Sequence, residues 1–188
     1  MIDLRNKVLP SSVDVGGRTF FIDTDYRRWL DFGAELESKH ITYEYLISFI
    51  IDDEVPPVNM AIELLEKLIE FYSKKSVTPH DIPESSIKSL DYILDGEYIY
   101  ASVLHYYNID LIDIDHLHWY KFRAMIDCIK DSKINDIISN RTWERPPRKY
   151  SSEHDNNQRE KIKKYWSLPS IYSEEDRKAK ERFDEIFG

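Results

Sequence analysis

Five side chains that could bind a metal ion lie close together in the middle of this 188-residue chain: Asp110, Asp113, Asp115, His116 and His118. Imidazole and carboxylate groups are ligands for zinc and manganese, so this cluster could support a metal-dependent enzyme. The surrounding residues, however, predict a helix over about 113–130. Two residues two positions apart on a helix point about 200° away from each other, so His116 and His118 would not share one ion. We therefore predict no metal, no cofactor and no catalytic site, and keep the enzyme as an alternative.

Each member of the cluster also has an ordinary structural interpretation. Asp113 or Asp115 is placed to cap the predicted helix and to favour its positive end. His118 falls on the apolar face, which is typical of a core histidine with one hydrogen-bond partner. Cys128, the one cysteine, lies in an apolar helical stripe and is expected to be a buried, inert thiol. No serine-histidine-aspartate signature and no phosphate-binding glycine loop is present, so we expect a protein that is not an enzyme.

Composition indicates a soluble globular chain. Hydrophobic residues make up 41% and charged residues 32%, which suits one domain or one domain with an appendage. The chain opens without a signal-like segment, and the longest apolar run, residues 45–51, is too short to cross a bilayer. We expect no membrane association and a cytoplasmic location.

The net charge of −9 is unevenly distributed. Residues 1–140 carry a net charge of −11 and residues 141–188 carry +2. An acidic body does not attract phosphates, so we expect no nucleic-acid partner. The basic segment 141–164 is interpreted as a solvated linker and helix face, with phosphate contact as the alternative.

The chain begins with a pattern typical of a β-hairpin. The segments Ser12-Val13-Asp14-Val15 and Arg18-Thr19-Phe20-Phe21-Ile22 flank Gly16-Gly17, and two glycines permit the positive φ angles of a tight turn. Asp23 or Thr24 is then expected to cap a helix running to about Ser38.

Helical spacing of apolar residues continues as far as Asn140. It predicts helices over about 42–51 (with a strand as the alternative), 57–74, 95–107, 113–130 and 134–140. Leu117, Trp119 and Phe122 are expected in the core. Asn108 suits the left-handed end of the third of these helices. The sequence therefore predicts a mainly α fold, with a single helical domain, a small N-terminal β-hairpin and a C-terminal helical arm.

The character of the sequence changes after Trp143. Residues 144–158 are polar and contain Pro146-Pro147, which predicts a flexible link. Residues 157–166 and a last stretch from Ser173 towards Phe187 have helical patterns. We predict a core domain over 1–143 and a link with an amphipathic helical arm over 144–188.

Several short motifs of this sequence follow one another in the same order as in a known family. They are Gly17-Arg18-Thr19-Phe20-Phe21-Ile22 with Thr24-Asp25-Tyr26-Arg27 and Trp29; Asp95, Ile99, Tyr100 and Ala101; Tyr107-Asn108-Ile109-Asp110-Leu111; Leu117-His118-Trp119-Tyr120-Lys121-Phe122; and Arg141. In these motifs the chain resembles the bacteriophage gene product fifteen family of tailed phages and prophages of Gram-positive bacteria. The family commonly has glycine at position 108 and often tryptophan at position 120.

The resemblance implies a role in phage tail assembly. By gene context the family is similar to tail-assembly chaperones, which implies a non-enzymatic factor. Such a factor would bind the tape-measure protein, assist assembly of the tail tube protein and be absent from the finished virion. A structural tail or neck component of the virion is the alternative.

A chaperone of this kind needs exposed apolar contact residues, and self-association is a further expectation. The candidates for protein contact lie outside the central helices: Trp143, Tyr150, Tyr165, Trp166, Leu168, Ile171, Tyr172, Phe183 and Phe187.

Overall fold

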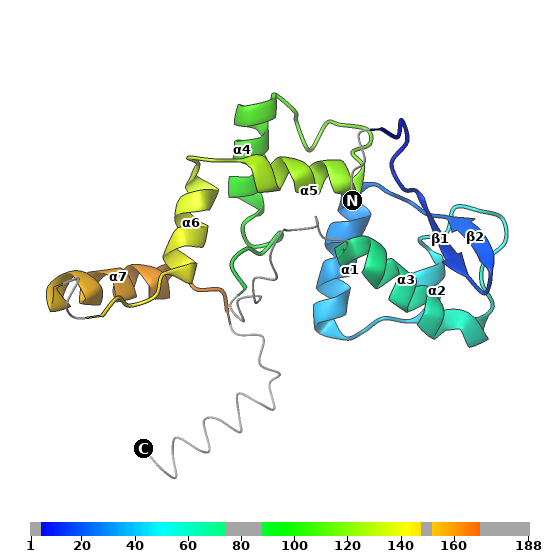
Figure 1. Ribbon diagram of the computed structural model, residues 1–188, viewed down its shortest axis with the longest axis horizontal. Helices are drawn as coiled ribbons and strands as arrows, with labels where there is room; N and C mark the ends of the chain where they lie inside the picture. The colour runs from blue at the N-terminus through cyan, green and yellow to red at the C-terminus, as the bar shows by residue number, and fades with distance from the viewer. Residues whose placement is uncertain (1–4, 74–87, 148–151, 170–188) are drawn as a thin grey trace, which may run out of the picture. The chain divides into compact units, whose positions relative to one another are not determined.

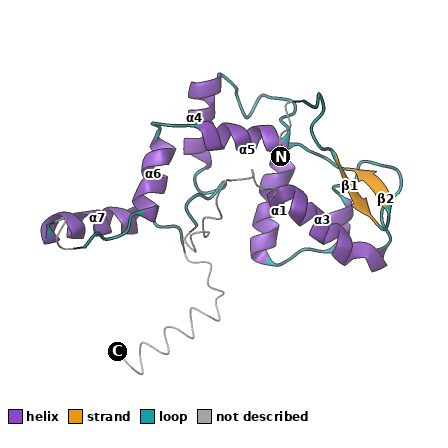
Figure 2. Cartoon of the chain, in the orientation of Figure 1, coloured by secondary structure: helices purple, strands orange, loops and turns teal. Residues whose placement is uncertain are grey.

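The computed structural model describes residues 5–73, 88–147 and 152–169. These ranges form seven α-helices, one short 3-10 helix and one two-stranded antiparallel sheet (Figures 1 and 2). The predicted mainly α fold, with a small N-terminal hairpin and a helical C-terminal region, is confirmed. Each helix in these ranges is too short or too polar to span a bilayer.

The chain divides into two compact units. Within the described ranges the body unit comprises residues 5–73 and 92–135, and the C-terminal unit comprises 88–91, 136–147 and 152–169. The predicted separation into domains 1–143 and 144–188 stays a prediction.

The hairpin pairs β1 (Ser12–Val15) with β2 (Arg18–Phe21) in the register Ser12↔Phe21 to Val15↔Arg18. Gly16 and Gly17 turn the chain with φ angles of 58° and 75°, as the sequence predicted. Val13, Val15 and Phe20 are buried, so one face of the hairpin belongs to the core of the body unit.

Three α-helices follow the hairpin: α1 (Tyr26–Ser38), α2 (Tyr43–Ile47) and α3 (Ala61–Ser73), the last preceded by the 3-10 helix η1 (Val58–Met60). The predicted N-cap of α1 was wrong by one or two residues. Asp25 caps the helix, because its side chain accepts a hydrogen bond from the amide of Arg27. Gly33 in α1 allows close approach of Tyr72, whose phenolic oxygen occupies the place that a Cβ would take.

An aromatic cluster fills the core of the body unit. Trp29 and Phe32 of α1 are fully buried. The Trp29 ring lies 4.5 Å from that of Phe71 in α3 and 5.1 Å from that of Phe49, which follows α2. Such contacts dominate burial in a small domain, so this cluster packs α1 against α3 and against the residue that follows α2.

The central helix is shorter than predicted. After α4 (Gly96–Tyr107), which ends at Asn108 in the predicted left-handed conformation (φ 51°), residues 108–118 form a connector, and α5 spans only Trp119–Cys128. The helical spacing of apolar residues predicted too long a helix here, because backbone pairing with another segment competes with helix formation. The amide of Trp119 donates to the carbonyl of Thr24 at 2.8 Å, and Asp25 and His118 form an isolated antiparallel bridge. The predicted burial of Leu117, Trp119 and Phe122 is confirmed.

The C-terminal unit contains most of α6 (Lys133–Thr142), together with α7 (Glu153–Trp166). Arg141 ties its parts together, donating from Nε to the Trp166 carbonyl at 2.6 Å and from a terminal nitrogen to the Ser89 carbonyl at 3.2 Å. The predicted link over 144–158 was too long, because α7 already begins at Glu153. The hydroxyl of Ser152 caps that helix by accepting from the amide of Asp155.

Candidate functional site

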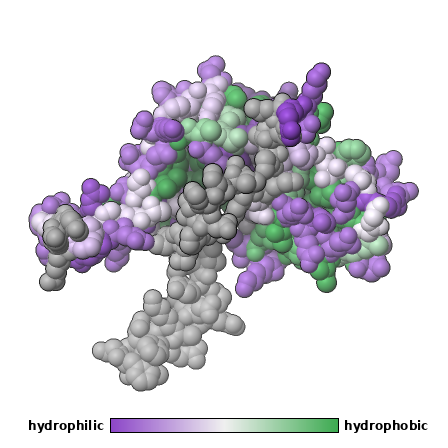
Figure 3. All heavy atoms as spheres, viewed as in Figure 1, coloured by the Kyte–Doolittle hydropathy of each residue, from purple (hydrophilic) through white to green (hydrophobic). Residues whose placement is uncertain are grey.

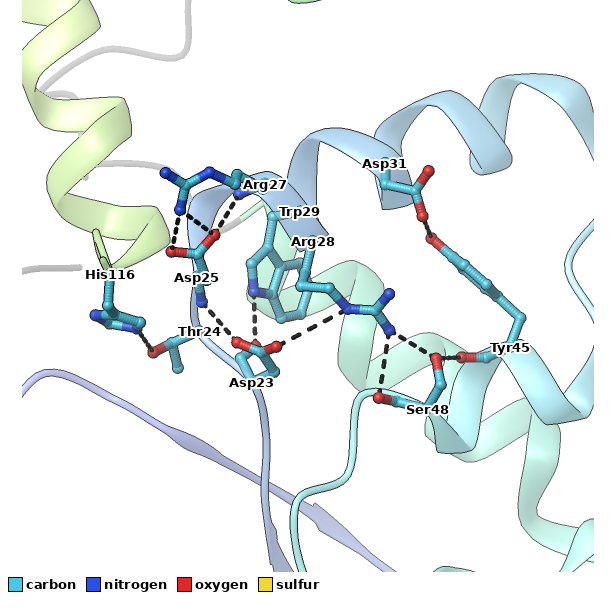
Figure 4. Close-up of polar contacts among 10 residues, drawn as sticks. All are labelled: Asp23, Thr24, Asp25, Arg27, Arg28, Trp29, Asp31, Tyr45, Ser48 and His116. Carbon is cyan, nitrogen blue, oxygen red and sulfur yellow. Dashed lines mark hydrogen bonds and ion pairs between the residues drawn. The ribbon is translucent and has the colours of Figure 1, made fainter. Parts of the chain in front are cut away.

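Polar contacts gather where the hairpin leads into α1, and Thr24, Asp25 and Arg27 of the family motifs take part in them (Figure 4). The Asp25 carboxylate accepts from the Arg27 amide at 3.1 Å and from the Leu117 amide at 3.1 Å. The Asp25 amide in turn donates to the carboxylate of Asp23 at 2.9 Å. Asp25 therefore joins the start of α1 to the segment just before α5.

Arg27 and Tyr26 hold the connector that leads to α5. One terminal nitrogen of Arg27 donates to the carbonyls of Leu111 and Ile114, at 2.9 and 2.8 Å. The Tyr26 hydroxyl donates to the same Leu111 carbonyl at 2.7 Å. These side chains satisfy backbone groups of an irregular segment, which is a structural role.

His118 is a satisfied core histidine, although the helical argument used to predict it was wrong. The residue precedes α5 and acts as its N-cap. Its Nδ1 accepts from the Tyr120 amide at 3.1 Å, and its Nε2 donates to the Pro10 carbonyl at 2.8 Å. Both ring nitrogens are occupied, which fixes the neutral tautomer. Burial lowers the pKa of His118 below its ordinary value.

The remaining members of the predicted cluster do not come together as a metal site. The exposed His116 bonds to the Thr24 hydroxyl at 3.1 Å. Neither Asp113 nor Asp115 caps a helix, so that prediction was wrong. Asp110 organises the connector instead, accepting from the Ile112 amide at 2.8 Å and from the Tyr100 hydroxyl at 3.0 Å. Among the described residues, no three histidine, cysteine or acidic side chains are arranged to hold a metal ion.

Cys128 is exposed, contrary to the prediction of a buried thiol. The predicted apolar stripe assumed a helix continuing to Lys130, whereas α5 ends at this cysteine. Its side chain is therefore at the helix end and not in the packed centre.

An apolar groove on the body unit is the best candidate for a binding site. It has a volume of about 400 Å³ and is open to solvent. Its walls come from α1, the turn before α4, α4 itself, the connector and α5, and are formed by Tyr26, Leu30, Tyr92, Gly96, Glu97, Ile99, Tyr100, Leu111, Ile112 and Phe122. The sequence did not reveal this groove, because its lining comes from separate segments. Ile112, which is 75% exposed within an acidic run, was the one local signal.

Three carboxylates lie at or near the groove. Glu97 lines it directly, while Asp110 and Asp113 lie near the lining residue Tyr100. Hydrogen bonding to Asp110 raises the pKa of the Tyr100 hydroxyl above its ordinary value, with a further contribution from the charge of Asp113. The groove therefore combines an apolar floor with an acidic rim.

The predicted contact residues fall into two sets. Tyr150, Ile171, Tyr172, Phe183 and Phe187 lie outside the described residues. Of the other four, Tyr165 is 77% exposed, while Trp143, Trp166 and Leu168 are half-buried. The rings of Tyr165 and Trp166 meet nearly at right angles, 5.0 Å apart, at the end of α7. On the face drawn in Figure 3, hydrophobic patches are set among hydrophilic residues.

A comparison with protein families gave a match over most of the chain. The family model described as Bacteriophage Gp15 protein matches residues 5–168. Searches of curated proteins and of solved structures each returned no match. The matched range includes the whole network around Asp25 and the groove, and it covers most of the chain. This chain therefore belongs to the bacteriophage Gp15 protein family.

Proposed function

We propose that this protein is a non-catalytic chaperone of phage tail assembly that binds the tape-measure protein in the host cytoplasm and assists assembly of the tail tube. Membership in a phage family supports a structural or assembly role. The groove on the body unit supports the finer statement that this role includes binding a partner segment.

The groove is the main support for this proposal, because its apolar lining suits the apolar face of a helix. The partner implied by the family resemblance is a long helical protein, and an amphipathic helix binds by placing apolar side chains into a groove of this kind. A volume of about 400 Å³ lies near the small end of ligand pockets, which favours a few large side chains over a cofactor. The exposed Ile112 at the groove extends its apolar surface towards such a partner.

The roles of the motif side chains support a non-catalytic protein. Asp25, Arg27 and His118 carry groups that enzymes use, yet each is engaged with backbone atoms of the same unit. A residue whose hydrogen bonds hold an irregular segment together stabilises the fold. Hydrogen bonds of this kind suit a rigid framework that holds the groove in shape.

Co-expression with the tape-measure protein tests the proposal. The wild-type chain should raise the soluble fraction of the tape-measure protein and co-purify with it. Ile112→Glu should abolish both effects, because it introduces a charge into the groove. Val58→Glu is the matched control, since Val58 is 66% exposed in η1 and does not line the groove. Equal solubility of the tape-measure protein with and without the wild-type chain would refute the proposal.

Mass spectrometry of purified virions separates the chaperone from a structural tail or neck component. We expect the protein in lysates of infected cells and not in the particle. A stoichiometric amount in purified virions would favour the structural role.

A further inference from the structure

The exposed face of α7 has a pattern complementary to the groove. Ile162 and Tyr165 are 44% and 77% exposed. Residues three apart lie about 60° from each other around a helix, so these two side chains share one face. Trp166 follows four residues after Ile162 and adds to the same stripe. Spacing of i, i+3 and i+4 is typical of a helix that binds in a groove.

Positive charge borders this stripe. Lys161 precedes Tyr165 by one turn, and Arg159 precedes Ile162 by three residues, so the two cations flank the apolar pair. Glu153 and Glu160 of the same helix pair with Arg145, at 2.6 and 3.0 Å. Arg159, Lys161 and Lys164 form no ion pair with any residue that the structure describes. The stripe on α7 therefore has a basic rim.

The rim of the groove has the opposite charge. Glu97 is an exposed lining residue, and Asp110 and Asp113 lie near Tyr100. The cations near the groove are engaged elsewhere: Arg27 bonds to Asp25 and to two backbone carbonyls, and Arg123 donates to the Tyr72 carbonyl at 2.8 Å. Residues 1–140 as a whole carry −11 and residues 141–188 carry +2.

From this complementarity we infer that α7 of one copy of the chain docks into the groove of a second copy. Tyr165 and Ile162 enter the apolar groove, while Lys161 and Arg159 face the acidic rim. A reciprocal exchange between two copies makes this contact twice and closes a symmetric dimer. Each contact is one helix end in a small groove, so association is reversible, with a dissociation constant on the order of micromolar. The inference does not depend on the tape-measure protein, which would compete with α7 for the same groove.

Sedimentation velocity over a range of concentrations tests the inference with the full chain. The wild type should shift from monomer to dimer as concentration rises, and added salt should favour the monomer. Tyr165→Glu and Ile112→Glu should each weaken dimerisation by about tenfold or more, because each places a charge in the contact. Both positions are exposed, so circular dichroism and melting should match the wild type. Val58→Glu, which adds the same charge elsewhere on the body unit, should leave dimerisation unchanged.

Mixing the two variants shows whether the contact joins two copies. Tyr165→Glu keeps an intact groove, and Ile112→Glu keeps an intact α7. Each alone should be monomeric, and their mixture should recover dimers through the one remaining contact. Failure of the mixture to associate, a wild type that is monomeric throughout, or variants that dimerise normally would each overturn the inference.

Discussion

Replacement of Trp119 by alanine should be among the most destabilising single changes in the body unit. The side chain is 1% exposed. Its ring stacks on Tyr72 at 5.2 Å with an interplanar angle of 9°, and on Phe122 at 5.9 Å with an angle of 20°. Removal of a buried tryptophan ring leaves a cavity that neighbours fill only in part, so we expect a loss of about 3–5 kcal/mol in the free energy of unfolding.

The hydrogen bond of the indole contributes little to this loss. Trp119 Nε1 donates to the Tyr72 carbonyl at 3.1 Å, but Arg123 donates to the same carbonyl at 2.8 Å. The carbonyl therefore stays satisfied without the indole, and a lost bond costs most when it leaves a buried partner unpaired. Trp119→Phe, which keeps an aromatic ring in the stack, should accordingly cost only about 1–2 kcal/mol.

Urea unfolding followed by circular dichroism measures these differences. The midpoint should fall in the order wild type, Trp119→Phe, Trp119→Ala, with little change in slope. Tyr165→Ala is the matched aromatic control, because an exposed ring should change stability by no more than about 0.5 kcal/mol. A change below about 1 kcal/mol for Trp119→Ala would refute the packing argument. Unchanged stability with lost partner binding would place Trp119 at a recognition surface.

Three further outcomes follow from the structure. Burial lowers the pKa of His118, so the contribution of His118 to stability is fully present above the unfolded pKa of about 6.5 and is lost as pH falls through the folded pKa. His118→Asn keeps a capping acceptor that does not titrate, so it should flatten this part of a curve of stability against pH. An unchanged curve would contradict the assignment. Exposed Cys128 should react with a maleimide in the native protein at nearly the rate seen in urea, and strong protection would contradict its exposure. Gly33→Ala should lower stability by about 1–3 kcal/mol in thermal melts, because the added methyl group meets the phenol of Tyr72; a stabilised variant would show that the ring moves freely.

Local patterns were sufficient to predict much of the fold. The Gly16-Gly17 turn, the helix ending at Asn108 and the burial of Trp119 all follow from properties of a few neighbouring residues, and all are present. These features depend on positive φ angles and on apolar periodicity, which can be recognised in a sequence without knowledge of distant contacts.

Long-range backbone contacts account for the main errors. The segment 113–118 has helical spacing, but Asp25 and Thr24 pair with its end and prevent a helix there. The position of Cys128 was misjudged for a second reason, because α5 ends at this residue and does not continue to Lys130. The groove could not be predicted from the sequence, because residues such as Leu30, Tyr100 and Ile112 become neighbours only after folding.

Site-specific photocrosslinking at position 112 tests the central claim most directly. Ile112 lies at the groove and is 75% exposed, so a photoreactive amino acid there should be tolerated and should capture whatever occupies the groove. During tail assembly in the host, we predict a crosslink to the tape-measure protein, identified by mass spectrometry, and none from the same amino acid at position 58. Capture of the tape-measure protein from position 58 but not from position 112 would contradict the assignment of the groove as its binding site.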